Sequence, residues 1–343
     1  MAGAAAGDPP FAFMGRVSRK AVGTVGSLGE WGFLARLLPK LSKGLSGRVA
    51  LGPGDDAALV RVGRETWALT TDMLVEGVHF RKEWTTGENL GHKTLAVNLS
   101  DLAAMGDVAP AVGVLSAGMP PKTPVRFIEG FYRGFARLAR EHGFELVGGD
   151  TVRSDRLVFS LAAFGRVRGL VFKRSGARVG DALMVTGTLG DAAAGLILLE
   201  KGGRRRDSFL VQRLLRPEPR LAWARRLAGT GGVTAGMDSS DGFWRSVKVL
   251  GESSRVGAEV WADRLPVSPS LRTWAKGRAE DFALVGGEDY ELVFTARPEA
   301  VRRIESFGFA REVGRILPSR RGFTALHDGR KREVPSGFEH FNG

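Results

Sequence analysis

Apolar residues follow two spacings along the chain, and each spacing predicts one kind of element. Apolar positions that recur every three or four residues predict helices, and these cover 30–41, 89–105, 125–142, 191–200, 217–227 and 241–250. Short apolar runs between Gly, Pro and Asp predict strands, and these cover 48–51, 59–62, 66–69, 111–117, 144–147, 157–165, 181–186, 258–261, 282–285 and 290–295, with further short strands beyond 309. Hairpins occur among the helices, so the predicted fold class is α+β.

The length of 343 residues suggests two domains, each with its own core. The sequence turns basic at 167–175, and we place the boundary there. This gives an N-terminal α/β domain at 28–166 and a C-terminal α/β domain at 167–343. Residues 1–27 are rich in Ala and Gly at their start and predict a disordered leader, or an artefact of start-site choice with Met14 as another possible start.

Composition and charge exclude several classes of protein. The absence of Cys excludes disulfides, thiolate zinc sites and Cys nucleophiles, and it is compatible with the cytoplasm, where we expect the protein to act. No apolar run is long enough to span a bilayer, so we expect no membrane partner. The net charge of +13 could attract nucleic acid. The basic residues are scattered, however, which favours a solvated Arg-rich surface and makes a nucleic-acid partner an unfavoured reading.

Acidic residues recur where predicted strands end. Asp72 follows strand 66–69 and two hydroxyl residues, Thr70 and Thr71. Another acid, Asp101, lies in the largely apolar sequence 97–105 of a predicted helix, which does not fit a solvated face. The acids of this kind are Asp55, Asp56, Asp72, Asp101, Asp150, Asp238 and Asp241. For any one of them alone, a turn or a helix-capping role remains the alternative.

Convergence of these acids would require a cation. Two like charges about 4 Å apart repel each other by roughly 4 kcal/mol at an effective dielectric near 20. Four or more carboxylates in one pocket are therefore stable only with divalent cations among them. Mg²⁺ is favoured because it prefers oxygen ligands and bridges to phosphates. The chain has no P-loop and no G-x-G-x-x-G sequence, so a nucleotide would bind in another way.

Two Gly-containing sequences add further candidates. Leu-Val-Gly-Gly followed by an acid occurs at 146–150 and again at 284–288, which predicts a strand end presenting an acid in each half. Gly190 and Asp191 at a helix start either offer free N–H groups to an anion or form a plain N-cap.

Nine short blocks occur in an order that resembles the thiamine-monophosphate kinase family, within the aminoimidazole ribonucleotide synthetase superfamily. The resemblance extends from about Gly29 to the C-terminus. The blocks are Gly54-Asp-Asp-Ala-Ala58, Thr71-Asp72 with Gly77-Val-His-Phe80, Ala96-Val-Asn-Leu-Ser-Asp-Leu-Ala-Ala-Met-Gly106, Gly148-Gly-Asp-Thr151, Arg174-Ser-Gly176, Val185-Thr-Gly-Thr188, Asp238-Ser-Ser-Asp-Gly242, Gly286-Gly-Glu-Asp-Tyr-Glu291 and Gly337-Phe-x-His-Phe341. Ser239 departs from the family, which more often has an apolar residue there.

The resemblance implies ATP-dependent phosphorylation of thiamine monophosphate to thiamine diphosphate by direct in-line γ-phosphoryl transfer. It implies Mg²⁺ positions at Asp56, Thr70, Thr71, Asp72, Asp101, Asp150, Asp238 and Asp241. It also implies ATP contacts at Gly149, Asp150, Arg174 and Ser240, and substrate contacts at His79, Glu288 and Phe338. The family's two-domain fold would pair the N-terminal sheet with its twin in a homodimer, with the ATP site near that interface. No catalytic base is expected, because the substrate's phosphate oxygen is already anionic.

Two other readings stay open. Another ATP-dependent enzyme of the superfamily, similar to aminoimidazole ribonucleotide synthetase, is the first. Selenophosphate synthetase and the hydrogenase-maturation dehydratase are disfavoured, because each is expected to carry a reactive Cys. A basic nucleic-acid-binding protein is the second, and its binding would fall steeply with salt.

Overall fold

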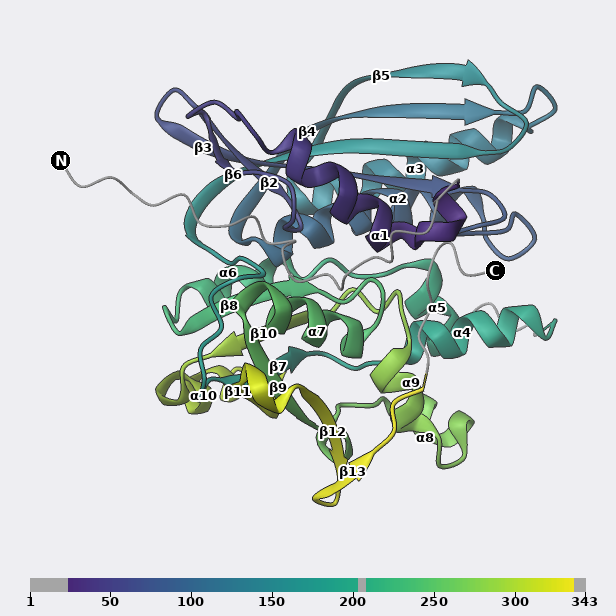
Figure 1. The fold of residues 1–343 in the computed structure, drawn as a ribbon. Helices are drawn as coiled ribbons and strands as arrows, with labels where there is room; N and C mark the ends of the chain where they lie inside the picture. Colours follow the sequence, from purple (N-terminus) through teal and green to yellow (C-terminus); the bar gives the residue numbers. More distant parts are fainter. Residues whose placement is uncertain (1–23, 203–207, 336–343) are drawn as a thin grey trace.

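The computed structural model describes residues 24–202 and 208–335. The N-terminal half forms the upper body in Figure 1 and the C-terminal half the lower body. Most of the predicted leader, residues 1–23, lies outside the described residues, and helix α1 begins at Val25. Within the described ranges, every helix is too short or too polar to cross a membrane.

The N-terminal half is built on a six-stranded sheet with the order β1-β2-β3-β6-β4-β5. Neighbouring strands are antiparallel, except β4 and β5, which are parallel. The elements of this half are α1 (Val25–Leu41), β1 (Val49–Leu51), β2 (Ala58–Val62), β3 (Glu65–Val75), α2 (Gly87–Ala104), β4 (Gly106–Met119), α3 (Val125–His142), β5 (Glu145–Arg153) and β6 (Val158–Val171). Strand β6 thus continues past the predicted end of the N-terminal domain at 166.

Helices α2 and α3 cover one face of this sheet (Figure 1). Inward-facing Leu115 and Phe159 are buried against them, and the Phe159 ring stacks on Phe131 of α3 with 4.1 Å between ring centroids. The two helices approach closely because of glycine: a Cβ on Gly91 of α2 would lie 1.9 Å from the Phe131 carbonyl oxygen. This contact fixes α2 beneath the sheet and leaves its other side to the C-terminal half.

The C-terminal half is built on a seven-stranded sheet with the order β13-β12-β9-β11-β7-β10-β8. Only β9 and β12 are parallel neighbours among the described strands of this sheet. Its elements are β7 (Ala182–Thr186), α4 (Asp191–Glu200), α5 (Phe209–Leu215), α6 (Leu221–Ala228), β8 (Val233–Asp238), α7 (Phe243–Ser254), β9 (Val256–Trp261), α8 (Pro269–Ala275), α9 (Ala279–Val285), β10 (Leu292–Ala296), α10 (Pro298–Glu305), β11 (Ala310–Pro318), β12 (Phe323–His327) and β13 (Arg330–Arg332), with short 3₁₀ turns at Ala262–Arg264 and Ser319–Arg321.

The predicted strand at 282–285 is wrong, because these residues form the last turn of helix α9. A short apolar run does not distinguish a strand from the end of a buried helix. Here Ala283 and Leu284 pack into the core, and acids at 280 and 281 occupy the first turn of the helix. In contrast, the similar sequence at 146–150 lies within strand β5. The two Leu-Val-Gly-Gly sequences therefore do not mark corresponding elements of the two halves.

Helix α2 lies between the two halves, contacting β3, β6 and α3 on one side and α5, α6 and β8 on the other. His92 of α2 joins the halves through both ring nitrogens. Nε2 is 2.8 Å from the Pro217 carbonyl oxygen, and Nδ1 is 3.2 Å from an Arg216 guanidinium nitrogen. Since a carbonyl only accepts and a guanidinium only donates, Nε2 carries the proton and Nδ1 accepts. Burial lowers the pKa of His92 from 6.5 to about 4, so the ring is neutral at neutral pH.

This buried neutral histidine predicts a pH dependence of stability. Because its pKa is lower in the folded protein, its contribution is complete above pH 6.5 and is lost as the pH falls toward 4. In thermal and denaturant unfolding, we expect the stability difference between the wild type and His92→Gln to shrink by about 2 kcal/mol from pH 7.5 to pH 5. A difference that does not change with pH would contradict this role of His92.

Candidate active site between the two halves

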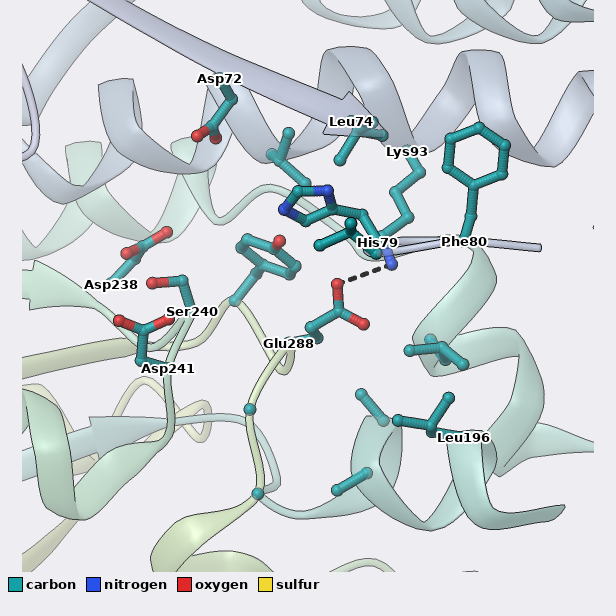
Figure 2. A pocket seen from close by; sticks show the side chains of 18 of the residues that line it. Asp72, Leu74, His79, Phe80, Lys93, Leu196, Asp238, Ser240, Asp241 and Glu288 are labelled. Atoms are coloured by element: carbon teal, nitrogen blue, oxygen red, sulfur yellow. Dashed lines mark hydrogen bonds and ion pairs between the residues drawn. The ribbon is translucent and has the colours of Figure 1, made fainter. Parts of the chain in front are cut away.

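A cavity of about 1000 Å³ opens between the N-terminal and C-terminal halves. Its walls come from β3 and the loop after it, from α2 and α4, and from two segments of the C-terminal half, 238–241 and 285–290. Figure 2 shows Asp72 of the N-terminal half facing the same space as Asp238, Ser240 and Asp241 of the C-terminal half. The cavity therefore brings together acids that are far apart in the sequence.

Three of these acids are close enough to share one ion. Asp56 lies in the turn before β2, Asp101 on α2 and Asp238 at the end of β8, and their carboxylate oxygens lie within 4.8 Å of one another. Asp72 and Asp241 line the same cavity. This is the convergence that the sequence predicted for these five acids.

Burial and mutual repulsion raise the pKa values of the clustered acids. Burial is the larger cause for Asp238, whose pKa is raised to about 8, and the charge of Asp56 adds to it. The pKa of Asp72 is raised to about 6 by burial and by Asp241. The pKa of Asp101 is raised well above its ordinary value by burial and by Asp72. Without a cation, the cluster therefore retains protons around neutral pH.

Hydroxyl groups orient two of these carboxylates, and an amide oxygen fixes the backbone of a third acid. The Thr70 hydroxyl donates to Asp101 Oδ2, and the Ser100 hydroxyl donates to Asp238 Oδ2 at 2.6 Å. The side-chain oxygen of Asn98 accepts from the backbone N–H of Asp72 at 3.0 Å. Such supporting bonds fix the direction of metal-binding oxygens. The Thr70 hydroxyl, predicted as a metal ligand, serves here as a partner of Asp101.

Arg174 approaches the cluster from the segment that connects the halves. Its guanidinium donates to Asp56 Oδ1 at 2.5 Å, and its backbone N–H donates to both carboxylate oxygens of Asp55 at 3.1 Å. The other oxygen of Asp56, Oδ2, is buried without a hydrogen-bond partner. A buried oxygen without a partner is costly, and a cation among the acids would satisfy it. The donor set, all hard oxygen, fits Mg²⁺.

Asp150 does not join the other acids in this chain. The strand pairing aligns it with Ser116, Ser160 and Met73 in one row across the sheet. Asp72 occupies the next row, and neighbouring rows point to opposite faces. In addition, β5 is three strands from β3, which is about 14 Å at about 4.8 Å per strand. Asp150 is exposed on the face opposite α2, so it cannot share an ion with Asp72 of the same chain.

Three other predicted residues also lie apart from the cluster or outside the described chain. Gly149 is next to Asp150 in β5, where its lack of a side chain is needed because a Cβ would lie 1.9 Å from the Leu115 carbonyl oxygen. Thr71 borders the cavity, but strand alternation directs its side chain away from Thr70 and Asp72. Phe338 lies outside the described residues.

The predicted substrate contacts His79 and Glu288 both line the cavity. His79 Nδ1 accepts from the backbone N–H of Val75 at 3.1 Å, so a neutral ring carries its proton on Nε2. Glu288 forms an ion pair of 2.8 Å with Lys93 of α2, the dashed line in Figure 2.

Comparison with known proteins identifies the family. The chain matches the models "AIR synthase related protein, N-terminal domain" over residues 54–167 and "AIR synthase related protein, C-terminal domain" over 178–327. A thiamine-monophosphate kinase of Aquifex aeolicus (strain VF5) is 35% identical over 320 residues, 92% of this chain and 98% of the relative. One of Salmonella typhimurium is 39% identical over 281 residues, 80% of this chain and 84% of the relative. The chain belongs to the thiamine-monophosphate kinase family.

Solved structures agree with this family membership. AaThiL complexed with AMPPCP and TMP is 33% identical with a TM-score of 0.82, covering 94% of this chain and 100% of that one. Thiamine-monophosphate kinase from Stenotrophomonas maltophilia K279a is 38% identical with a TM-score of 0.71, covering 87% and 96%. The resemblance and the two-domain mixed fold inferred from the sequence are thus confirmed.

The family sequence Gly286-Gly-Glu-Asp-Tyr-Glu291 divides its three acids among three tasks. Glu288 faces the cavity. The carboxylate of Asp289 accepts from the N–H groups of Gly190 and Ala192 at the start of α4. Glu291 is buried in ion pairs with Arg213 and Arg220. The N–H groups at the start of α4, which the sequence suggested could bind an anion, therefore bind the carboxylate of Asp289.

Sequence reasoning missed Lys93, which lines the cavity, and Ser100, which donates to Asp238 from behind it. Both lie in the apolar helix that drew attention to Asp101, and the same signal, a polar residue in an apolar context, could have found them. Their partners, Glu288 and Asp238, are distant in sequence. Spacing along one helix therefore could not reveal what they contact.

The raised pKa values predict how Mg²⁺ stabilises this family member. The pKa of Asp238 is about 8 in the folded chain against 3.8 normally, so stability without a cation falls as the pH rises from about 4 toward 8. A bound cation replaces those protons. We expect Mg²⁺ to raise the Tm, relative to a sample with EDTA, more at pH 8 than at pH 6. A sample with NaCl at the same ionic strength is the control. Equal gains at both pH values, or equal gains with NaCl, would show that Mg²⁺ does not occupy the cluster.

Proposed function

We propose that the protein transfers the γ-phosphoryl group of ATP to the phosphate of thiamine monophosphate, producing thiamine diphosphate and ADP. Family membership supports this reaction, and the observation that carries it is the convergence of Asp56, Asp101 and Asp238 from both halves at one cavity. Phosphoryl transfer between two polyanions needs such a site, because it depends on charge neutralisation and alignment.

The clustered acids are the residues that would hold Mg²⁺. Asp56, Asp101 and Asp238 would form the core of the site, with Asp72 and Asp241 beside them. When bound, Mg²⁺ neutralises phosphate charge and stabilises the loose transition state. The chain's own contribution is to hold the oxygens of Asp101 and Asp238 in place through the hydroxyls of Thr70 and Ser100.

No side chain is needed as a general base. The attacking phosphate oxygen is already anionic, so no proton has to be removed from it. The cavity histidine, His79, lines the cavity in the loop after β3, where it can contact the substrate. Ser240 and Arg174 line the cavity beside the acids, where they can contact ATP phosphates. Glu288, at the other end, can attract the thiamine cation, and Phe338 stays a prediction.

The open face of the N-terminal sheet supports a homodimer. Apolar side chains on this face, exposed or half-buried, lie on three adjacent strands and include Leu69, Met73, Val114, Ala162 and Phe164. Gly149 and Asp150 lie at the edge of the same sheet. Their predicted contacts with ATP would thus be made at the interface between two copies rather than within one chain. Action in the cytoplasm stays part of this proposal.

A direct assay tests the proposed reaction. Incubation with ATP, Mg²⁺ and thiamine monophosphate should produce thiamine diphosphate, and omission of any one component should prevent it. Formation of ADP without thiamine diphosphate would favour a different ATP-dependent enzyme of the superfamily.

Asp72→Asn should remove activity while the protein stays folded. We expect turnover to fall by more than about 100-fold, because changing a residue that only supports a metal ligand already costs about 10- to 100-fold. Asp263→Asn, at an exposed acid of the C-terminal half, is the matched control. Near wild-type turnover by folded Asp72→Asn at saturating Mg²⁺ and ATP would refute its role.

The homodimer can be tested at Val114, which is 41% exposed at the open sheet face. Val114→Asp should convert the dimer into a monomer in sedimentation, because an unpaired carboxylate would be buried at the interface. Val179→Asp, at an exposed valine of the other half, should leave the dimer intact. If the wild type is itself a monomer, or both variants remain dimers, this sheet face is not the interface.

A further inference from the structure

Lys93 is a basic side chain buried in the cavity wall, next to a predicted substrate contact. Its side chain is 4% exposed, although lysine is rarely buried without a partner. The partner is Glu288, 28% exposed, whose Oε1 lies 2.8 Å from the Lys93 nitrogen. Lys93 belongs to α2 of the N-terminal half, and Glu288 belongs to the C-terminal half, so the pair links the two halves at the cavity wall (Figure 2).

Glu288 is held in an unusual backbone conformation. Its φ is +65°, in the left-handed region that residues other than glycine rarely adopt. Its backbone N–H donates to the Ser240 carbonyl oxygen at 2.6 Å, which ties this turn to the segment with Asp238 and Asp241. Backbone strain of this kind persists where the surroundings enforce it and is common at ligand sites.

The position of Lys93 along α2 sets where its charge acts. Lys93, Val97 and Asp101 are spaced by four residues and line the cavity from one face of the helix. Eight residues of helix separate Lys93 from Asp101, which is about 12 Å. A substrate whose phosphate lies at the acid cluster would therefore direct its organic end toward the pair of Lys93 and Glu288.

We propose that Lys93 is a positioning residue that holds the Glu288 carboxylate in the cavity to receive the cationic organic end of the phosphate substrate. The inference rests on the proposed function. Lys93 offsets the charge of Glu288, so this carboxylate can stay charged in the cavity wall. It engages Oε1, and a carboxylate has a second oxygen that can accept a hydrogen bond from a bound molecule.

A double-mutant cycle tests this role. In Lys93→Met, we expect the KM for thiamine monophosphate to rise at least about tenfold, which is the usual effect of losing a hydrogen bond to a charged group. The KM for ATP should change by less than about twofold. Glu288→Gln should raise the same KM. Adding Lys93→Met to Glu288→Gln should change it by less than about twofold, because Lys93 then has no carboxylate to hold. Lys122→Met, at an exposed lysine, is the matched control.

Additive effects of the two substitutions, or equal effects on both substrates, would overturn the proposal. If Lys93→Met alone does not fold, the KM of Glu288→Gln for thiamine monophosphate is compared with that of the double variant, because neither protein has a charged, unpaired Glu288. A KM that is a further tenfold higher in the double variant would overturn the proposal.

The proposed function is tested separately by the wild type. If the wild type forms no thiamine diphosphate, that function fails, and thermal unfolding of the same four proteins still tests the pair. Lys93→Met must then lower the Tm less in the Glu288→Gln background than in the wild type, and equal losses would overturn the pairing.

Discussion

Repulsion among buried carboxylates is the constraint on which this structure depends. Asp56 and Asp101 come from the N-terminal half and Asp238 from the C-terminal half, and all three present oxygens to one space. In a partly buried site, such charges repel strongly, so the native arrangement needs protons or a cation. The two halves thus bring like charges together where they meet. A cation that relieves the repulsion would therefore join the halves and also prepare the site to receive phosphates.

Helix α2 is the element that makes this arrangement possible. Its glycines let α3 hold it tightly beneath the sheet, and its polar side chains contact the C-terminal half. His92 reaches the segment before α6, Lys93 reaches Glu288, and Ser100 reaches Asp238. Each contact satisfies a buried polar group, which is the condition for placing such groups in an apolar helix. One helix therefore supports the core, the contact between halves and the cavity wall.

Much of the fold and of the acid cluster could be predicted from the sequence, because short motifs that occur in a fixed order indicate both the fold and the site. The boundaries of α3 and α4 follow directly from helical spacing, and Asp101 stands out as an acid in an apolar helix. The run at 282–285 was misassigned, since four apolar residues fit a strand or a helix end equally well. Its true state depends on packing against distant residues, which spacing does not contain.

The remaining gaps have the same origin. The grouping of Asp150 with the other acids failed for a single chain because strand order and the sheet face it occupies are long-range properties. The sequence does not indicate the role of Lys93, because that role depends on its contact with Glu288, which is 195 positions away. Residue type and spacing thus indicate what chemistry is available, whereas the tertiary structure decides which groups share a site.

The most direct test is a crystal structure of the protein grown with Mn²⁺ in place of Mg²⁺ and measured at a wavelength where Mn²⁺ scatters anomalously. An anomalous peak within bonding distance of carboxylate oxygens of Asp56, Asp101 and Asp238 is the predicted result. Ordered side chains at these three positions with no peak among them, at saturating Mn²⁺, would contradict the claim that a divalent cation joins the two halves there.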